Sequence, residues 1–192
     1  MSLILGILAQ SGGAAVAASS YESIATITGN TSGTITFTSI PQTYKHLQLR
    51  CILRTVNSSY TFLNYNIRVG NGSIDTGSNY TYHRLYGTGS GSGSSDGGAN
   101  QSAGLLAATS TGSPDYYFAP TILDILDYSS TNKYKTMRSL GGYDLNGSGG
   151  VYFQSFLWMN NSGIDTMQFN VGGASPETVG ASHFALYGIK GV

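Results

Sequence analysis

Asp124 and Asp127 are the acidic side chains whose spacing comes closest to that of a catalytic or metal-binding pair. They lie in the run Ile122-Leu123-Asp124-Ile125-Leu126-Asp127. Residues three apart in a β-strand point to opposite faces, so the two carboxylates could share a metal ion or a substrate only if a bulge intervened. We therefore interpret Asp127 as the first residue of a turn that continues to Ser130, with its carboxylate bonding the following backbone.

The histidines and the cysteine add no catalytic or metal-binding pattern. His46, His83 and His183 are far apart, and none has a second ligand at the spacing of a metal site. Cys51 is the only cysteine, so the chain has no internal disulfide and no cysteine-based zinc site. Cys51 alternates in phase with the neighbouring leucines, which predicts a buried core position. No phosphate-binding glycine motif occurs. We expect a protein that is not an enzyme and that uses no cofactor or metal.

Aromatic side chains gather in two segments that could form a binding surface. The candidate ligand or docking residues are Tyr80, Tyr82, His83, Arg84, Tyr86, Tyr116 and Tyr117. Tyrosine rings offer wide, stiff contact surfaces at low entropy cost, which suits sugars or protein partners. If the two segments meet at one end of the fold, they would form a glycan or docking site. The alternative is that these side chains are core residues or cross-strand pairs.

Charge is scarce throughout the chain. Charged residues make up 9% of the sequence, and nine basic residues balance nine acidic ones. Such a chain has no positive field that would hold nucleic acid or an anionic membrane. It also has little charge to keep copies apart, which favours a subunit whose exterior meets other protein.

Residues 1–20 are predicted to form an N-terminal anchoring arm. Its apolar residues are Leu3, Ile4, Leu5, Ile7 and Leu8. This run is too short to span a bilayer, and the first Lys or Arg of the chain is Lys45, so we expect neither a membrane span nor a secretory signal. Gly12, Gly13 and the small residues after them favour a tether to a neighbouring subunit. Packing of the arm on its own domain is the alternative.

Residues 21–192 are predicted to form one all-β domain, because short alternating runs are separated by turn residues. The predicted strands are Tyr21 to Thr28, Thr34 to Thr38, Leu47 to Leu53, Phe62 to Val69, Tyr80 to Tyr86, Leu105 to Thr109, Pro120 to Tyr128, Lys133 to Leu140, Val151 to Met159, Met167 to Val171 and Ser182 to Ile189. So many short strands indicate an antiparallel β-sandwich or a barrel. The stretch from Gly87 to Gly98 is nearly all Gly, Ser and Thr and is predicted to be a loop.

Several segments resemble small virion structural proteins of tailed bacteriophages, including those of cyanophages. The segments are FTSIPQTYKHLQLR from Phe37 to Arg50, GSNY from Gly77, ILDY from Ile125, KTMRS from Lys135 and FALYGIKG from Phe184. They follow one another in the same order and extend over nearly the whole domain. The resemblance implies a jelly-roll-like β-sandwich and a location on the virion, and it carries no catalytic motif.

Together these observations predict a bacteriophage capsid decoration or cement protein that contacts the major capsid protein and itself, as a homotrimer. The alternative is a tail fibre or tail appendage protein that binds host glycan through the tyrosine segments. A depolymerase would need paired carboxylates in a groove. A secreted lectin-like domain would need a better signal sequence.

Overall fold

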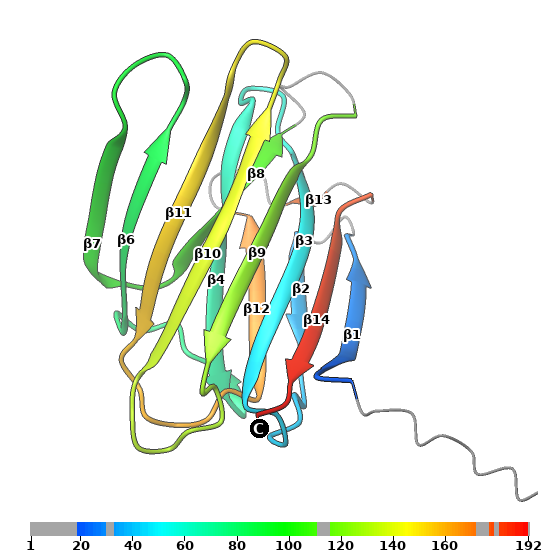
Figure 1. Cartoon of the computed structure of the whole chain (residues 1–192), viewed down its shortest axis with the longest axis vertical. Helices are drawn as coiled ribbons and strands as arrows, with labels where there is room; N and C mark the ends of the chain where they lie inside the picture. Colours follow the sequence, from blue (N-terminus) through cyan, green and yellow to red (C-terminus); the bar gives the residue numbers. More distant parts are fainter. Residues whose placement is uncertain (1–18, 30–32, 111–115, 172–176, 179–180, 192) are drawn as a thin grey trace, which may run out of the picture.

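The domain is built from β-strands, in agreement with the alternating sequence pattern. The computed structural model describes residues 19–29, 33–110, 116–171, 177–178 and 181–191, and the five apolar residues of the predicted arm lie outside these ranges. The described residues form fourteen strands and no helix (Figure 1). Accordingly, this part of the chain contains no helix that could cross a membrane.

Two sheets face each other and form a β-sandwich. In order across sheet A, the strands are β1 (Tyr21–Thr28), β14 (His183–Ile189), β3 (His46–Val56), β9 (Ala119–Leu126), β10 (Lys135–Asp144), β11 (Gly149–Trp158), β6 (Tyr80–Gly87) and β7 (Ser94–Gln101). Sheet B has the order β2 (Thr34–Phe37), β12 (Thr166–Val171), β4 (Phe62–Asn71) and β8 (Gly104–Ser110). The short strand β5 (Ser73–Ile74) pairs with β4, and β13 (Glu177–Thr178) pairs with β3.

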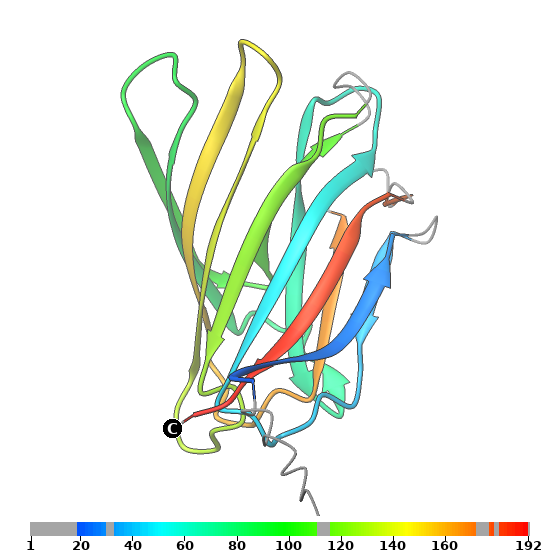
Figure 2. The same ribbon diagram turned by 45° about the vertical axis from the view of Figure 1, so that its right-hand side comes forward.

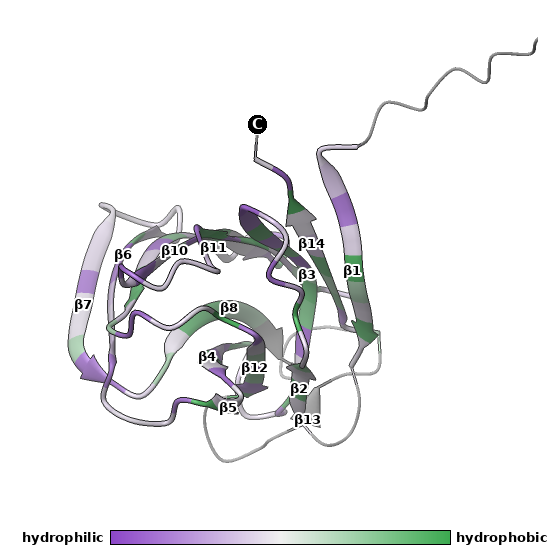
Figure 3. Ribbon diagram, turned by 90° about the horizontal axis from the view of Figure 1, so that it is seen from below, coloured by the Kyte–Doolittle hydropathy of each residue, from purple (hydrophilic) through white to green (hydrophobic). Residues whose placement is uncertain are grey.

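The strand pairs are antiparallel with one exception, which links the sheets. Arg54 and Thr55, near the end of β3, pair in parallel with the last two residues of β8. Figure 2 shows β1, β14, β3 and β9 in front of β4 and β12. Figure 3 shows sheet A curving over sheet B, with β1 and β7 at its two edges.

The core follows from alternation along the strands. In β3 the residues Leu47, Leu49, Cys51 and Leu53 are buried, whereas Arg50 between them is exposed. The prediction that Cys51 is a core residue is therefore confirmed, and burial raises the pKa of its thiol.

Aromatic rings fill the space between the sheets. Phe184 on β14 lies 5.8 Å from Tyr65 and 5.6 Å from Phe169, measured between ring centroids, and these partners belong to sheet B. On the other side of the sandwich, Phe62 stacks on Tyr152 at 5.3 Å. Such ring pairs add to the free energy gained by burying apolar area.

The prediction of a loop over Gly87 to Gly98 was wrong in its second half, because β7 begins at Ser94. Strand pairing uses backbone groups, so a segment almost without large side chains can still form a ladder. Gly98 pairs with Tyr82, and a Cβ on Gly98 would lie 2.9 Å from the Tyr82 ring. The ring therefore covers the glycine, a contact that compensates for the missing side chain.

Candidate protein-binding face

Four large apolar side chains form a line across the outer face of sheet A, and we call them the apolar row. They are Ile122 on β9, Leu140 on β10, Phe153 on β11 and Leu85 on β6. Ile122 pairs with Leu140, Leu140 with Phe153, and Phe153 with Leu85. Directly paired residues point to the same face, about 5 Å apart. The row is thus continuous over four neighbouring strands.

The row is open to solvent. The four residues are between 42% and 60% exposed, while their chain neighbours Leu123, Ser139 and Gln154 point inward and are buried. Burying one large apolar side chain completely is worth about 1.5–3 kcal/mol. Soluble monomers seldom leave such residues contiguous on the surface, and a contiguous apolar patch typically marks an interaction site.

One end of the row opens into an apolar pocket of about 600 Å³. Phe118, Pro120, Leu140 and Val151 are among the residues that line it. Gly142 also lines the pocket, and a Cβ on this residue would lie 2.5 Å from the carbonyl oxygen of Gly150. A side chain is therefore excluded at this position, which helps to keep the pocket open.

Polar residues border the row. Arg50 pairs with Ile122 across the β3–β9 ladder, and its guanidinium lies 5.9 Å from the Tyr21 ring and 5.5 Å from the Tyr187 ring. Asp124, one residue pair further along β9, accepts a hydrogen bond from Gln48 at 2.8 Å. An apolar centre with a polar rim is the usual composition of a protein–protein interface.

The first tyrosine segment serves mainly the internal packing of the domain. Arg84 forms a bidentate pair with Asp96, with both N···O distances at 2.6 Å, and this partner raises the pKa of Arg84. The guanidinium also lies over the rings of Tyr82 and Tyr86. Tyr80 is fully buried, so it offers no surface to a ligand.

Other members of the predicted tyrosine site lie apart from this cluster. His83 points to the outer face and is exposed. Tyr116 is 92% exposed and has a positive φ of 72°. Tyr117 is half-buried. The first segment lies on β6 and the second directly precedes β9, and β10 and β11 lie between those strands. The sheet order thus separates the two parts of the expected site.

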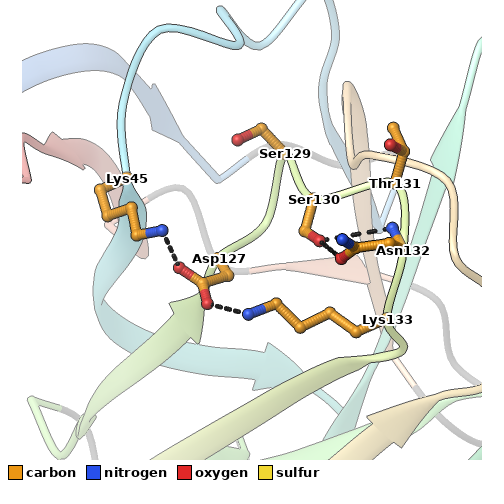
Figure 4. A pocket seen from close by; sticks show the side chains of 7 residues that line it. All are labelled: Lys45, Asp127, Ser129, Ser130, Thr131, Asn132 and Lys133. Atoms are coloured by element: carbon orange, nitrogen blue, oxygen red, sulfur yellow. Dashed lines mark hydrogen bonds and ion pairs between the residues drawn. The ribbon is translucent and has the colours of Figure 1, made fainter.

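Asp127 lies in a small polar pocket, where two lysines neutralise its carboxylate (Figure 4). Lys133 bonds one oxygen, and the Nζ of Lys45 lies 2.8 Å from the other. The hydrogen bonds from Lys133 and Lys45 lower the pKa of Asp127 to about 2. The predicted turn is present, but its hydrogen bond runs from the amide of Ser130 to the Asp127 carbonyl oxygen, at 3.0 Å. The prediction that the Asp127 carboxylate bonds the following backbone was wrong, because the carboxylate contacts Lys45 and Lys133 instead.

Asp124 and Asp127 do not act as a pair. Asp124 contacts Gln48 and lies 3.7 Å from Arg138, whereas Asp127 contacts the two lysines. β9 ends at Leu126, so Asp127 belongs to the following turn. Across the described ranges, no group of three His, Cys, Asp or Glu side chains could hold a metal ion.

Sequence reasoning missed the apolar row, although one signal for it was present. Val151, Tyr152 and Phe153 are consecutive residues with aliphatic or aromatic side chains. Consecutive strand residues alternate between the two faces of a sheet. A strand with apolar side chains on both faces is typical of a sheet that is covered on both sides. Here sheet B covers one side only, so Val151 and Phe153 remain exposed on the other side.

Comparison with known proteins found no relative from which a function could be transferred. No family model matches the sequence, no curated protein matches it, and no solved structure matches the fold. The function is therefore inferred from the residues and their arrangement.

Proposed function

We propose that this chain is a structural subunit of a bacteriophage virion, acting as an outer capsid decoration or cement protein. The observation that carries the proposal is the apolar row on the outer face of sheet A, because such a face is stable when another protein covers it. The low charge of the chain supports the same role, since it leaves little repulsion between neighbouring subunits. In this role the protein acts by burying surface against neighbouring subunits, and a specific protein–protein interface buries roughly 1,200–2,000 Å² in total.

The strand order supports a jelly roll with two inserted hairpins. Four antiparallel pairs are nested in the chain: β1 with β14, β2 with β12, β3 with β9, and β4 with β8. Folding such nested pairs over one another gives the two four-stranded sheets β1-β14-β3-β9 and β2-β12-β4-β8, which is the jelly-roll arrangement common in viral capsid domains. The strands β6 and β7 and the strands β10 and β11 then extend one sheet.

Copy number tests the location on the particle. The chain is quantified by mass spectrometry in purified virions, relative to the major capsid protein. A ratio between one-to-one and one-to-three supports a decoration protein. A few to a few dozen copies per particle contradicts it and supports a tail appendage, for which the exposed residues Tyr116 and His83 are the remaining candidate contacts to host glycan.

A charge-insertion experiment tests the face itself. The double variant Leu140→Lys/Phe153→Lys places two positive charges in the row, and Thr136→Lys/Ser155→Lys places two on the same strands and the same face outside it. Re-binding of each purified variant to particles stripped of the chain is measured. We expect the row variant to bind at least about tenfold more weakly and the control to bind nearly as the wild type. Equal binding by both variants would show that the row is not the docking face.

A further inference from the structure

We propose that β7 pairs with β7 of a second copy of this chain, so that two subunits join edge to edge into one continuous sheet. The inference goes beyond the proposed function, because it names a second copy as partner and an edge strand as the contact. Among the described strands only β6 pairs with β7, so the backbone N–H and C=O groups on its other edge meet no described strand. Figure 1 shows β7 at one edge of sheet A and β1 at the other.

β7 lacks the features that usually protect an edge strand. Edge strands are kept from pairing with other chains by lysine, proline, a bulge or a very short length. β7 has eight residues, contains neither Lys nor Pro, and is exposed over most of its length. It has one extra residue opposite β6, since the run from Gly98 to Gln101 faces the shorter run from Tyr82 to Tyr80. This bulge lies at the C-terminal end, so the stretch that begins at Ser94 and reaches Gly98 keeps a regular, open edge.

The other sheet edges formed by described strands are protected. β1 contains a bulge between Ser23 and Ala25, and Glu22 near its start forms an ion pair with Lys190. β2 has only four residues. The middle of β8 is buried, and its end is closed by the parallel pairing with β3. Of these edge strands, β7 alone combines length, exposure and a regular backbone.

The composition of β7 suits an identical partner. Its one charged residue is Asp96, which Arg84 neutralises through the bidentate pair with N···O distances of 2.6 Å. Two β7 strands side by side therefore bring no unneutralised like charges together. The other side chains of the strand belong to Ser, Gly, Ala, Asn and Gln. Because an antiparallel ladder is formed by backbone groups, two identical strands can pair without any complementarity between their side chains.

An identical partner also gives a closed contact. In an antiparallel pair related by a two-fold axis, each copy uses the same edge, so both β7 edges are satisfied once two copies have joined. Pairing of β7 with β1 of another copy would leave one edge of each kind free and would continue into a fibre. The bulge and the ion pair of β1 oppose that contact. The edge contact therefore gives a dimer, in place of the homotrimer expected from the sequence.

The dimer places both apolar rows on one face of the joined sheet. The two-fold axis is perpendicular to the sheet and keeps the outer faces of the two copies on the same side. The row ends one strand from the contact, because Leu85 pairs with Ser95 of β7. The Leu85 residues of the two copies are then three strand spacings, about 14 Å, apart. Eight large apolar side chains thus face the same side. The use of this enlarged face for docking rests on the proposed function, whereas the edge contact does not.

Sedimentation velocity of the full-length protein over a range of concentrations tests the proposal. The edge variant Ser94→Lys/Ser95→Lys places lysine at two exposed positions of β7. The two variants of the charge-insertion experiment add the same charge, one in the row and one outside it, and serve as controls. A stretch of five residues makes few hydrogen bonds, so we expect a wild-type dimer that dissociates on dilution. The edge variant should dimerise at least about tenfold more weakly, and both controls should dimerise as the wild type does.

Hydrogen exchange of the wild type locates the contact without any substitution. Protection of residues 94–98 should rise with protein concentration, while protection of β1 should stay constant. A monomer at every concentration, a trimer, or concentration-dependent protection confined to other strands overturns the proposal. Equal weakening of the dimer by the edge variant and by the controls overturns it as well. None of these measurements uses virions, so the edge contact and the proposed function can fail separately.

Discussion

The Tyr80 hydroxyl is expected to act in stability and not in ligand binding, and the substitution Tyr80→Phe separates the two roles. This hydroxyl accepts a hydrogen bond from the amide of Val69 at 2.9 Å, and the carbonyl oxygens of Val69 and Asp75 lie 3.1 and 3.0 Å away as acceptors for its proton. The ring is fully buried, and burial raises the pKa of the phenol, so the neutral form is present at neutral pH.

The size of the effect follows from which groups lose their partners. In Tyr80→Phe the Val69 carbonyl keeps a hydrogen bond from the amide of Asp75, at 3.0 Å, but the buried Val69 amide loses its acceptor. A buried donor without an acceptor costs about 1–3 kcal/mol. For a chain of this length each kcal/mol lowers the melting temperature by about 2–4 °C.

The assay is urea unfolding at pH 7, followed by the fluorescence of Trp158, the single tryptophan, and by circular dichroism. Trp158 pairs with Tyr80 across the β11–β6 ladder, so it reports on this region. The control is Tyr82→Phe, because no hydrogen bond of the Tyr82 hydroxyl is found within the described segments. We expect the control to lose less than about 0.5 kcal/mol. If Tyr80→Phe is equally mild, the hydroxyl does not hold the start of β6 to β4, and the reasoning fails.

Three further predictions concern other positions. Asp127→Asn removes the charge and keeps a residue type that tolerates the positive φ of 48°. The substitution should lower the free energy of unfolding by about 1 kcal/mol or less at pH 7, because solvent screens the ion pairs with the exposed lysines. Because the native pKa is depressed to about 2, this contribution should be present above about pH 4 and vanish as the pH falls toward 2; a difference that persists in acid would contradict the ion-pair explanation. Gly188→Ala should cost about 1–3 kcal/mol in chemical denaturation, because its Cβ would lie 2.3 Å from the Tyr44 ring, while Gly91→Ala, with open space around it, should be nearly neutral; similar losses would contradict the close packing. Cys51 should resist alkylation by iodoacetamide in the native protein and react after unfolding, and rapid native labelling would contradict its burial.

Most of the strands could be predicted from the sequence, since their alternation records which face is buried. β1 spans Tyr21–Thr28, as predicted, and β3 and β2 carry the predicted buried positions at Leu47, Leu49, Ile35 and Phe37. β7 could not be predicted in this way. Its glycines and serines carry no hydrophobic period, and its place is set by backbone pairing with β6 and by the ring of Tyr82.

The candidate face depends on long-range register, which a single sequence does not contain. Ile122, Leu140 and Phe153 come from three consecutive strands and Leu85 comes from the distant strand β6, and only the pairing of β9, β10, β11 and β6 makes them neighbours. The tyrosine segments show the opposite case. They are compact in sequence, but alternation along β6 directs Arg84 inward and His83 outward. Residues that are neighbours in the sequence therefore lie on opposite faces of the sheet.

The location of the row on the inserted strands connects the fold to the proposed role. Only Ile122 lies on one of the four nested pairs, whereas Leu140, Phe153 and Leu85 lie on β10, β11 and β6. The eight nested strands could form a closed two-layer sandwich without these insertions. The insertions widen sheet A, and the aromatic stack of Phe62 on Tyr152 and the salt bridge between Arg84 and Asp96 hold the added strands in place. Packing is thus used to support strands whose outer surface is apolar and exposed. That arrangement has a physical reason if a neighbouring subunit covers the added surface.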